Sequence, residues 1–145
     1  MSTLKINHIG VAVPSIVDFL ERNQVLYSGF SRGPLIVNAT QGVNEMFITD
    51  GKTVLELLEP ASEASPIAGV LKRSRSGALV HIALDVDDLE RTLHSVEESG
   101  GRAIVGPVPD IAFGERRIAF VLLNGHVTEL IERSSAVAKE EDPGV

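Results

Sequence analysis

The stretch NHIGVAVPSIVDFL at residues 7–20 returns in altered form as VHIALDVDDLERTL at residues 80–93, an offset of 73 positions. The same offset places MFITDGKTVLELLE, residues 46–59, over AFVLLNGHVTELIE, residues 119–132. Both blocks align without a gap, and they match His with His and Glu with Glu as well as apolar with apolar residues. The chain is therefore predicted to be a tandem duplication whose halves fold alike.

Each half has the residue pattern of a strand, a helix and three further strands, a βαβββ module. The strands expected in the first half span residues 4–13, 34–38, 43–49 and 53–59. Those expected in the second half span residues 78–86, 103–105, 116–123 and 126–132. Asp50-Gly51 and Asn124-Gly125 mark the turn of the last hairpin in each half.

The modules are predicted to form a single domain over residues 1–133, with module one at 4–60 and module two at 78–133. A linker helix is expected at 65–75, because Ser65-Pro66 is a typical helix start. Its last turn is rich in cations, which favour the helix dipole or alternatively contact a phosphate. The polar residues 134–145 are expected to form a flexible tail.

Composition narrows the class of protein. The 145 residues are 43% hydrophobic and 23% charged, which is typical of a globular domain. The net charge of −7 disfavours nucleic acid as a partner, and the absence of cysteine excludes disulfides and thiolate metal sites. There is no apolar run of about 18 residues and no secretory pattern at the start, so neither a membrane anchor nor export is expected. We therefore predict a cytoplasmic protein.

His8, Glu56, His81 and Glu129 are the residues of these strands that carry chemistry. Because strand side chains alternate, His8 shares a face with Gly10 and Ala12, and the larger branched residues lie on the other face. A lone strand histidine is usually a core residue, but one His and one Glu in each half point to a common purpose. Two imidazoles and two carboxylates suit a divalent metal ion, with Zn, Ni, Co, Mn and Fe(II) equally acceptable.

Four motifs resemble the vicinal oxygen chelate superfamily and, within it, the methylmalonyl-CoA epimerases. They are NHIGVAVPSI at 7–16, ELLEPASEASPIAGVL at 56–71, HIALDVDDLERTL at 81–93 and AFVLLNGHVTELIE at 119–132. The resemblance implies an α+β fold in which the two modules form a curved, partly open mixed β-sheet around the metal site, with the helices outside. It also assigns His8, His81 and Glu129 to the metal positions of the family and Glu56 to the fourth.

The resemblance implies a metal-dependent isomerase that removes and returns the alpha proton of a 2-substituted acyl-CoA through a metal-stabilised enolate. Glu45 and Glu129 would act as the catalytic base and acid, and the enzyme would be a homodimer. Two alternatives stay open at this point. One is a glyoxalase I-like lactoylglutathione lyase, which would use the same four ligands. The other is a metal-free small-molecule-binding or resistance protein.

Overall fold

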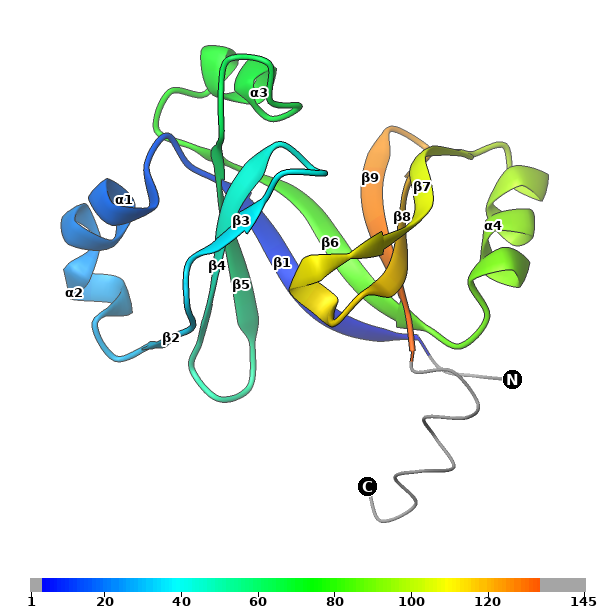
Figure 1. Cartoon of the computed structure of the whole chain (residues 1–145), viewed down its shortest axis with the longest axis horizontal. Coiled ribbons are helices and arrows are strands. Elements are labelled where there is room, and N and C mark those ends of the chain that lie inside the picture. The colour runs from blue at the N-terminus through cyan, green and yellow to red at the C-terminus, as the bar shows by residue number, and fades with distance from the viewer. Residues whose placement is uncertain (1–3, 134–145) are drawn as a thin grey trace. The chain divides into compact units, whose positions relative to one another are not determined.

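The computed structural model describes residues 4–133, and its fold is α+β with an open, mixed β-sheet (Figure 1). Contacts divide the described chain into two compact units. We call residues 7–82 the first unit, and residues 83–133 together with residues 4–6 the second unit. The predicted tail at 134–145 lies outside the described residues.

The first unit holds most of the first module. Its strands are β1 (Lys5–Ala12), β2 (Ser31–Arg32), β3 (Ile36–Asn38), β4 (Val43–Thr49), β5 (Val54–Pro60) and the start of β6 (Ala78–Val86). Their order is β2-β4-β5-β1-β6, and β3 also pairs with β4. The β1–β5 pairing is parallel and the β4–β5 pairing is antiparallel, which makes the sheet mixed.

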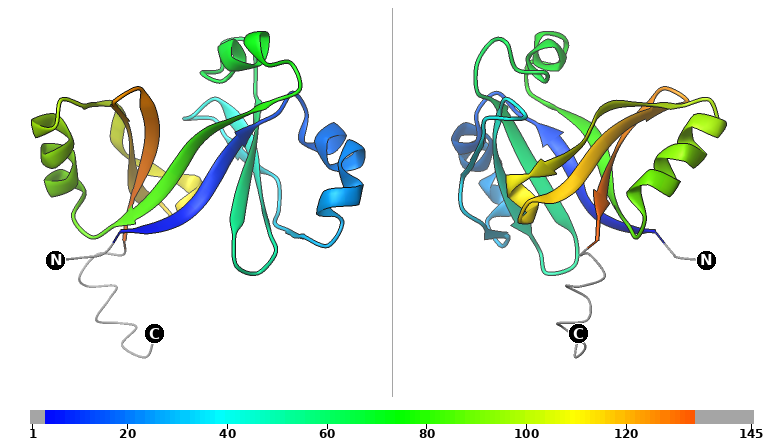
Figure 2. Two further views of the ribbon diagram at one scale, coloured as in Figure 1. Left: turned by 180° about the vertical axis from the view of Figure 1, so that it is seen from behind. Right: turned by 45° about the vertical axis from the view of Figure 1, so that its right-hand side comes forward.

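Helices α1 (Ile16–Arg22) and α2 (Gln24–Tyr27) lie to one side of these strands (Figures 1 and 2). The core between them buries the side chains of Val13, Ile16, Leu20, Ile48 and Leu57. Ser15 caps α1, since its Oγ accepts a hydrogen bond from the Asp18 N–H at 3.2 Å. The one helix expected after the first strand is wrong for this module, because Asn23 ends α1, and its Nδ2 donates to the Phe19 carbonyl at 2.8 Å.

The second unit contains α4 (Leu89–Glu98), β7 (Arg102–Asp110), the short 3-10 turn η1 (Ile111–Phe113), β8 (Arg116–Leu123) and β9 (His126–Glu132). Together with β6 these elements confirm the predicted βαβββ order, and the strand order is β6-β9-β8-β7. Helix α4 packs on the sheet through a core made of Val86, Leu89, Leu93, Ala119, Val121 and Leu130.

Two predicted boundaries were wrong. Strand β7 runs to Asp110 rather than ending at 105, because its position at the end of the strand order tolerates the prolines at 107 and 109. The linker helix, α3, spans Ala68–Arg73 instead of 65–75. Ser65 and Pro66 form a turn ahead of it, closed by a 3.0 Å hydrogen bond from Ala68 N–H to the Ser65 carbonyl. No helix among residues 4–133 is long and apolar enough to cross a membrane.

Asp88 is expected to contribute measurably to the stability of the second unit. Its carboxylate caps α4 by accepting a hydrogen bond from the Arg91 N–H at 3.0 Å. Asp88→Ala should lower the free energy of unfolding in urea by about 1 kcal/mol, whereas Asp88→Ser should retain most of it because serine also caps. Equal stability of the alanine and serine variants would contradict a capping role.

Candidate metal centre

Strand register in the first unit brings the predicted residues onto one face of the sheet. Gly10 of β1 and Phe47 of β4 are the partners of Glu56 on the two sides of β5. Directly paired residues point to the same face, and alternation adds every second residue along each strand. His8 therefore shares the face of Glu56, while Leu55 and Leu57 point to the opposite face, where Leu57 joins the helix-covered core.

Three side chains of this face converge on a common centre. Nε2 of His8 lies 3.1 Å from Nε2 of His81. Oε1 of Glu56 lies 3.2 Å from Nε2 of His8 and 3.4 Å from Nε2 of His81. His8 is 1% exposed, Glu56 is 3% exposed and His81 is 8% exposed, so the centre is shielded from bulk water.

Asn7 determines that Nδ1 of His8 carries a hydrogen. Nδ1 of His8 lies 2.8 Å from the side-chain oxygen of Asn7, and because an amide oxygen only accepts, Nδ1 carries the hydrogen. When the ring is neutral, Nε2, the atom that faces Glu56, presents a bare lone pair to a metal ion; when the ring is protonated, the same atom donates a hydrogen bond to Glu56. A ligating histidine typically has its other nitrogen bound in this way, so Asn7 is a supporting residue of the centre.

The charge of Glu56 has to be balanced where it lies. Burial by itself raises the pKa of this carboxyl group, but hydrogen bonds and positive charge from His8 and His81 outweigh it and lower the pKa to about 2. Glu56 is therefore a carboxylate that needs a cation beside it, either a protonated imidazole or a metal ion.

The spacing of the three atoms fits a divalent ion. Ligand atoms held about 2.0–2.2 Å from such an ion are roughly 3.0–3.5 Å from one another in tetrahedral or octahedral geometry. The observed separations of 3.1, 3.2 and 3.4 Å fall in that range. Nitrogen and carboxylate donors together suit the first-row transition metals.

The neighbours of the centre make room for it and wall it in. A Cβ atom at Gly10 would stand only 2.6 Å from Nδ1 and Nε2 of His81, so His81 occupies the space that the missing side chain leaves. The Phe47 ring packs edge-on against His8 with ring centroids 5.5 Å apart. Small residues beside the histidines were predicted, and Gly10 shows why they are needed.

Residues 7–120 match the model of the Glyoxalase/Bleomycin resistance protein/Dioxygenase superfamily. The chain belongs to this superfamily. The match includes the strands that carry His8, Glu56 and His81, and it confirms the resemblance read from the sequence motifs.

Similar proteins within the superfamily include epimerases. An ethylmalonyl-CoA/methylmalonyl-CoA epimerase of Cereibacter sphaeroides is 32% identical over 132 residues, which cover 87% of this chain and 96% of that protein. A Streptomyces coelicolor methylmalonyl-CoA epimerase variant in complex with 2-nitronate-propionyl-CoA superimposes with a TM-score of 0.75 at 27% identity, covering 92% and 100% of the two chains. The hypothetical protein BH1468 of Bacillus halodurans superimposes with a TM-score of 0.79 at 32% identity, covering 92% and 97%.

The other residues singled out in the sequence fall into two groups. Glu45 and Glu129 are buried, at 3% and 2% exposed, on β4 of the first unit and β9 of the second unit. The other two histidines, His94 and His126, lie at exposed positions, and His94 pairs with Glu98 at 2.7 Å. Sequence reasoning missed Asn7, although a polar residue directly before a strand histidine is a usable signal.

Gly10→Ala is expected to weaken metal binding without unfolding the protein. The added methyl group would push the His81 ring out of the centre, so affinity for Co(II), followed by its visible absorption, should fall by about ten- to hundredfold. Gly29→Ala is the matched control, because nothing lies within 4 Å of the Cβ it would add. Unchanged Co(II) affinity in Gly10→Ala would show that His81 is not a metal ligand.

Proposed function

We propose that this protein is a metal-dependent isomerase that epimerises a 2-substituted acyl-CoA thioester, with methylmalonyl-CoA as the substrate. The observation that carries the proposal is the buried triangle of His8, Glu56 and His81. Its chemistry agrees with the names of the relatives, which are epimerases of this substrate class. The predicted homodimer and cytoplasmic location remain predictions.

The metal ligands in this proposal are His8, Glu56, His81 and Glu129. Glu129 occupies the position in the second module that Glu56 occupies in the first, and its side chain is buried on β9. When bound, a divalent ion would supply Lewis-acid stabilisation of the negative charge that develops on the thioester oxygen.

Glu45 is the proposed base. It is buried on the face of β4 that also carries Phe47, the partner of Glu56, and it pairs with Leu58. Glu45 and Glu56 are therefore diagonal neighbours across β4 and β5. Residues in that relation lie about 7–8 Å apart, which leaves room for a substrate carbon between Glu45 and the metal centre. Glu45 would take the proton from carbon 2, and Glu129 would act as the acid that returns a proton from the other face.

Asn38 holds Glu45 in position. Asn38 is 2% exposed on β3, and its Oδ1 accepts a hydrogen bond from the Gln41 N–H at 3.3 Å. That contact directs the amide nitrogen toward Glu45, whose Oε1 it reaches at 3.4 Å. A base must sit within reach of the proton that it removes, so a restrained Glu45 favours proton transfer.

The test is exchange of the alpha proton with deuterated solvent, followed by NMR. Protein loaded with Co(II) or Zn(II) should exchange the carbon-2 proton of methylmalonyl-CoA, and metal-stripped protein should not. The hemithioacetal of methylglyoxal and glutathione serves as the comparison substrate, because conversion to lactoylglutathione would favour the glyoxalase reading. Absence of metal binding would favour a metal-free binding protein.

Glu45→Gln should abolish proton transfer without affecting metal binding. The amide keeps the shape of the side chain but cannot accept the proton, so the rate of epimerisation should fall by about 10²–10⁴-fold while Co(II) affinity stays constant. Glu21→Gln on the exposed part of α1 is the control. A Glu45→Gln enzyme that epimerises methylmalonyl-CoA at the parental rate would show that another group is the base.

A further inference from the structure

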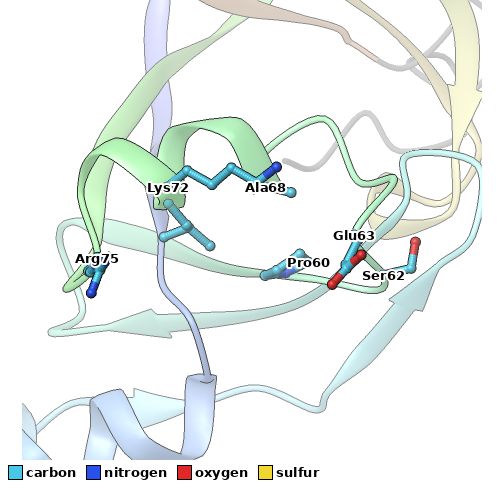
Figure 3. A pocket seen from close by; sticks show the side chains of 7 residues that line it. Pro60, Ser62, Glu63, Ala68, Lys72 and Arg75 are labelled. Atoms are coloured by element: carbon cyan, nitrogen blue, oxygen red, sulfur yellow. The ribbon is translucent and has the colours of Figure 1, made fainter.

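Glu59 is a charged residue of β5 that the proposed reaction does not use. Alternation along the strand places its side chain on the same face as Leu57, which lies in the helix-covered core, and on the opposite face from Glu56. Pro60 follows it and ends β5, where it lines a cavity beside α3 (Figure 3). The described residues that line this cavity do not include Glu59. Glu59 therefore points neither to the metal centre nor into the cavity, and its role lies in the contacts that it makes with α1 and β4.

The two carboxylate oxygens of Glu59 bind two different elements. Oε1 accepts a hydrogen bond from the Ile16 N–H, in the first turn of α1, at 2.9 Å. Oε2 accepts a hydrogen bond from Nδ2 of Asn44, the direct partner of Glu59 on β4, at 3.3 Å. Both contacts are partly shielded from water, and a hydrogen bond to an ionised group is stronger than one between neutral groups. One side chain thus links β5 to β4 and to the start of α1.

Each of the linked elements carries or adjoins a group of the proposed site. Asn44 is the neighbour of Glu45 along β4, and β5 carries Glu56 itself. Helix α1 follows β1, the strand of His8, after residues 13–15. The strands of the proposed base and of two proposed metal ligands are therefore joined on the helix-covered face by a single carboxylate.

The second unit contains the same kind of link, made by different residues. The offset of 73 places Arg117 over Asn44 and Glu132 over Glu59. Arg117 donates to the two carboxylate oxygens of Glu132 at 2.8 and 2.9 Å, and to Glu90 in the first turn of α4 at 2.9 Å. Two chemically different sets of side chains therefore join the last hairpin to the helix, which indicates that the link itself is what each half needs.

We infer that Glu59 is a positioning residue: from the helix-covered face of the sheet it holds the base Glu45 and the ligand His8 in place. The effect on the base rests on the proposed function. Proton transfer needs the base within hydrogen-bond reach of the proton that it removes, and a displacement of about 1 Å can slow a reaction about a hundredfold. Metal ligands likewise lose affinity when the groups that orient them are removed.

Asn44→Ala and Glu59→Ala separate the two contacts. Asn44→Ala releases β4 alone, so kcat for methylmalonyl-CoA should fall by about tenfold, with KM and Co(II) affinity unchanged. Glu59→Ala also releases the start of α1, so its Co(II) affinity, followed by visible absorption, should fall by about tenfold as well. Asp88→Ala is the control, because it removes a helix cap in the second unit and should lower stability while kcat and Co(II) affinity stay at the parental values.

A double variant that exchanges donor and acceptor tests the contact between the two strands. In Glu59→Gln the side-chain oxygen still accepts from the Ile16 N–H, and the new amide group becomes a donor. Asn44→Asp supplies the matching acceptor on β4. Glu59→Gln/Asn44→Asp should therefore recover most of the kcat and the Co(II) affinity that Glu59→Ala loses.

Three results would overturn the inference. They are parental kcat and Co(II) affinity in Glu59→Ala, an equal loss of kcat in Asp88→Ala, which would assign the effect to stability, and a double variant no faster than Glu59→Ala. If Glu59→Ala does not fold, Asn44→Ala and the double variant decide by the same criteria. If the parent protein does not epimerise methylmalonyl-CoA, the proposed function fails, while the Co(II) affinities of Glu59→Ala and Asp88→Ala still decide whether Glu59 holds the metal ligands.

Discussion

A carboxylate buried beside two imidazole nitrogens is the constraint on which the site depends. Glu56 is 3% exposed in a strand of aliphatic residues, and an unpaired charge there would cost several kcal/mol. His8 and His81 stand close enough to offset that cost, either as protonated rings or as co-ligands of a metal ion. Since the ligands are assembled only when the sheet forms, the free energy of binding an ion also stabilises the fold.

Strand alternation lets β5 serve two purposes at once. Leu57 points into the core beneath α1, whereas Glu56 points to the metal centre on the other face. The parallel neighbour β1 divides its side chains in the same way, with Val13 just beyond it in the core and His8 at the centre. Because a slip of one residue would exchange the two faces, the core itself holds the ligands in register.

The repeat made much of this site predictable. One offset identified His8, Glu56 and His81, and it also located the hairpins and β6. The wrong helix and strand ends came from local interactions of single residues, which hydrophobic periodicity does not show. Asn23 ended a helix through its own side chain, and β7 accommodated prolines at the end of the strand order. The supporting role of Asn38 depends on a hydrogen bond to Glu45 of the paired strand β4, and no single-sequence pattern could assign it.

Comparing the two modules position by position separates packing from chemistry. In the second unit, Ile118 is fully buried and packs with Ala83 and Ile131. The offset of 73 maps these three residues onto Glu45, Gly10 and Leu58 of the first unit. A carboxylate thus stands where the duplicate has an aliphatic core residue, and a glycine where it has a methyl group. Both differences forgo apolar packing, and the glycine leaves the space that the His81 ring occupies.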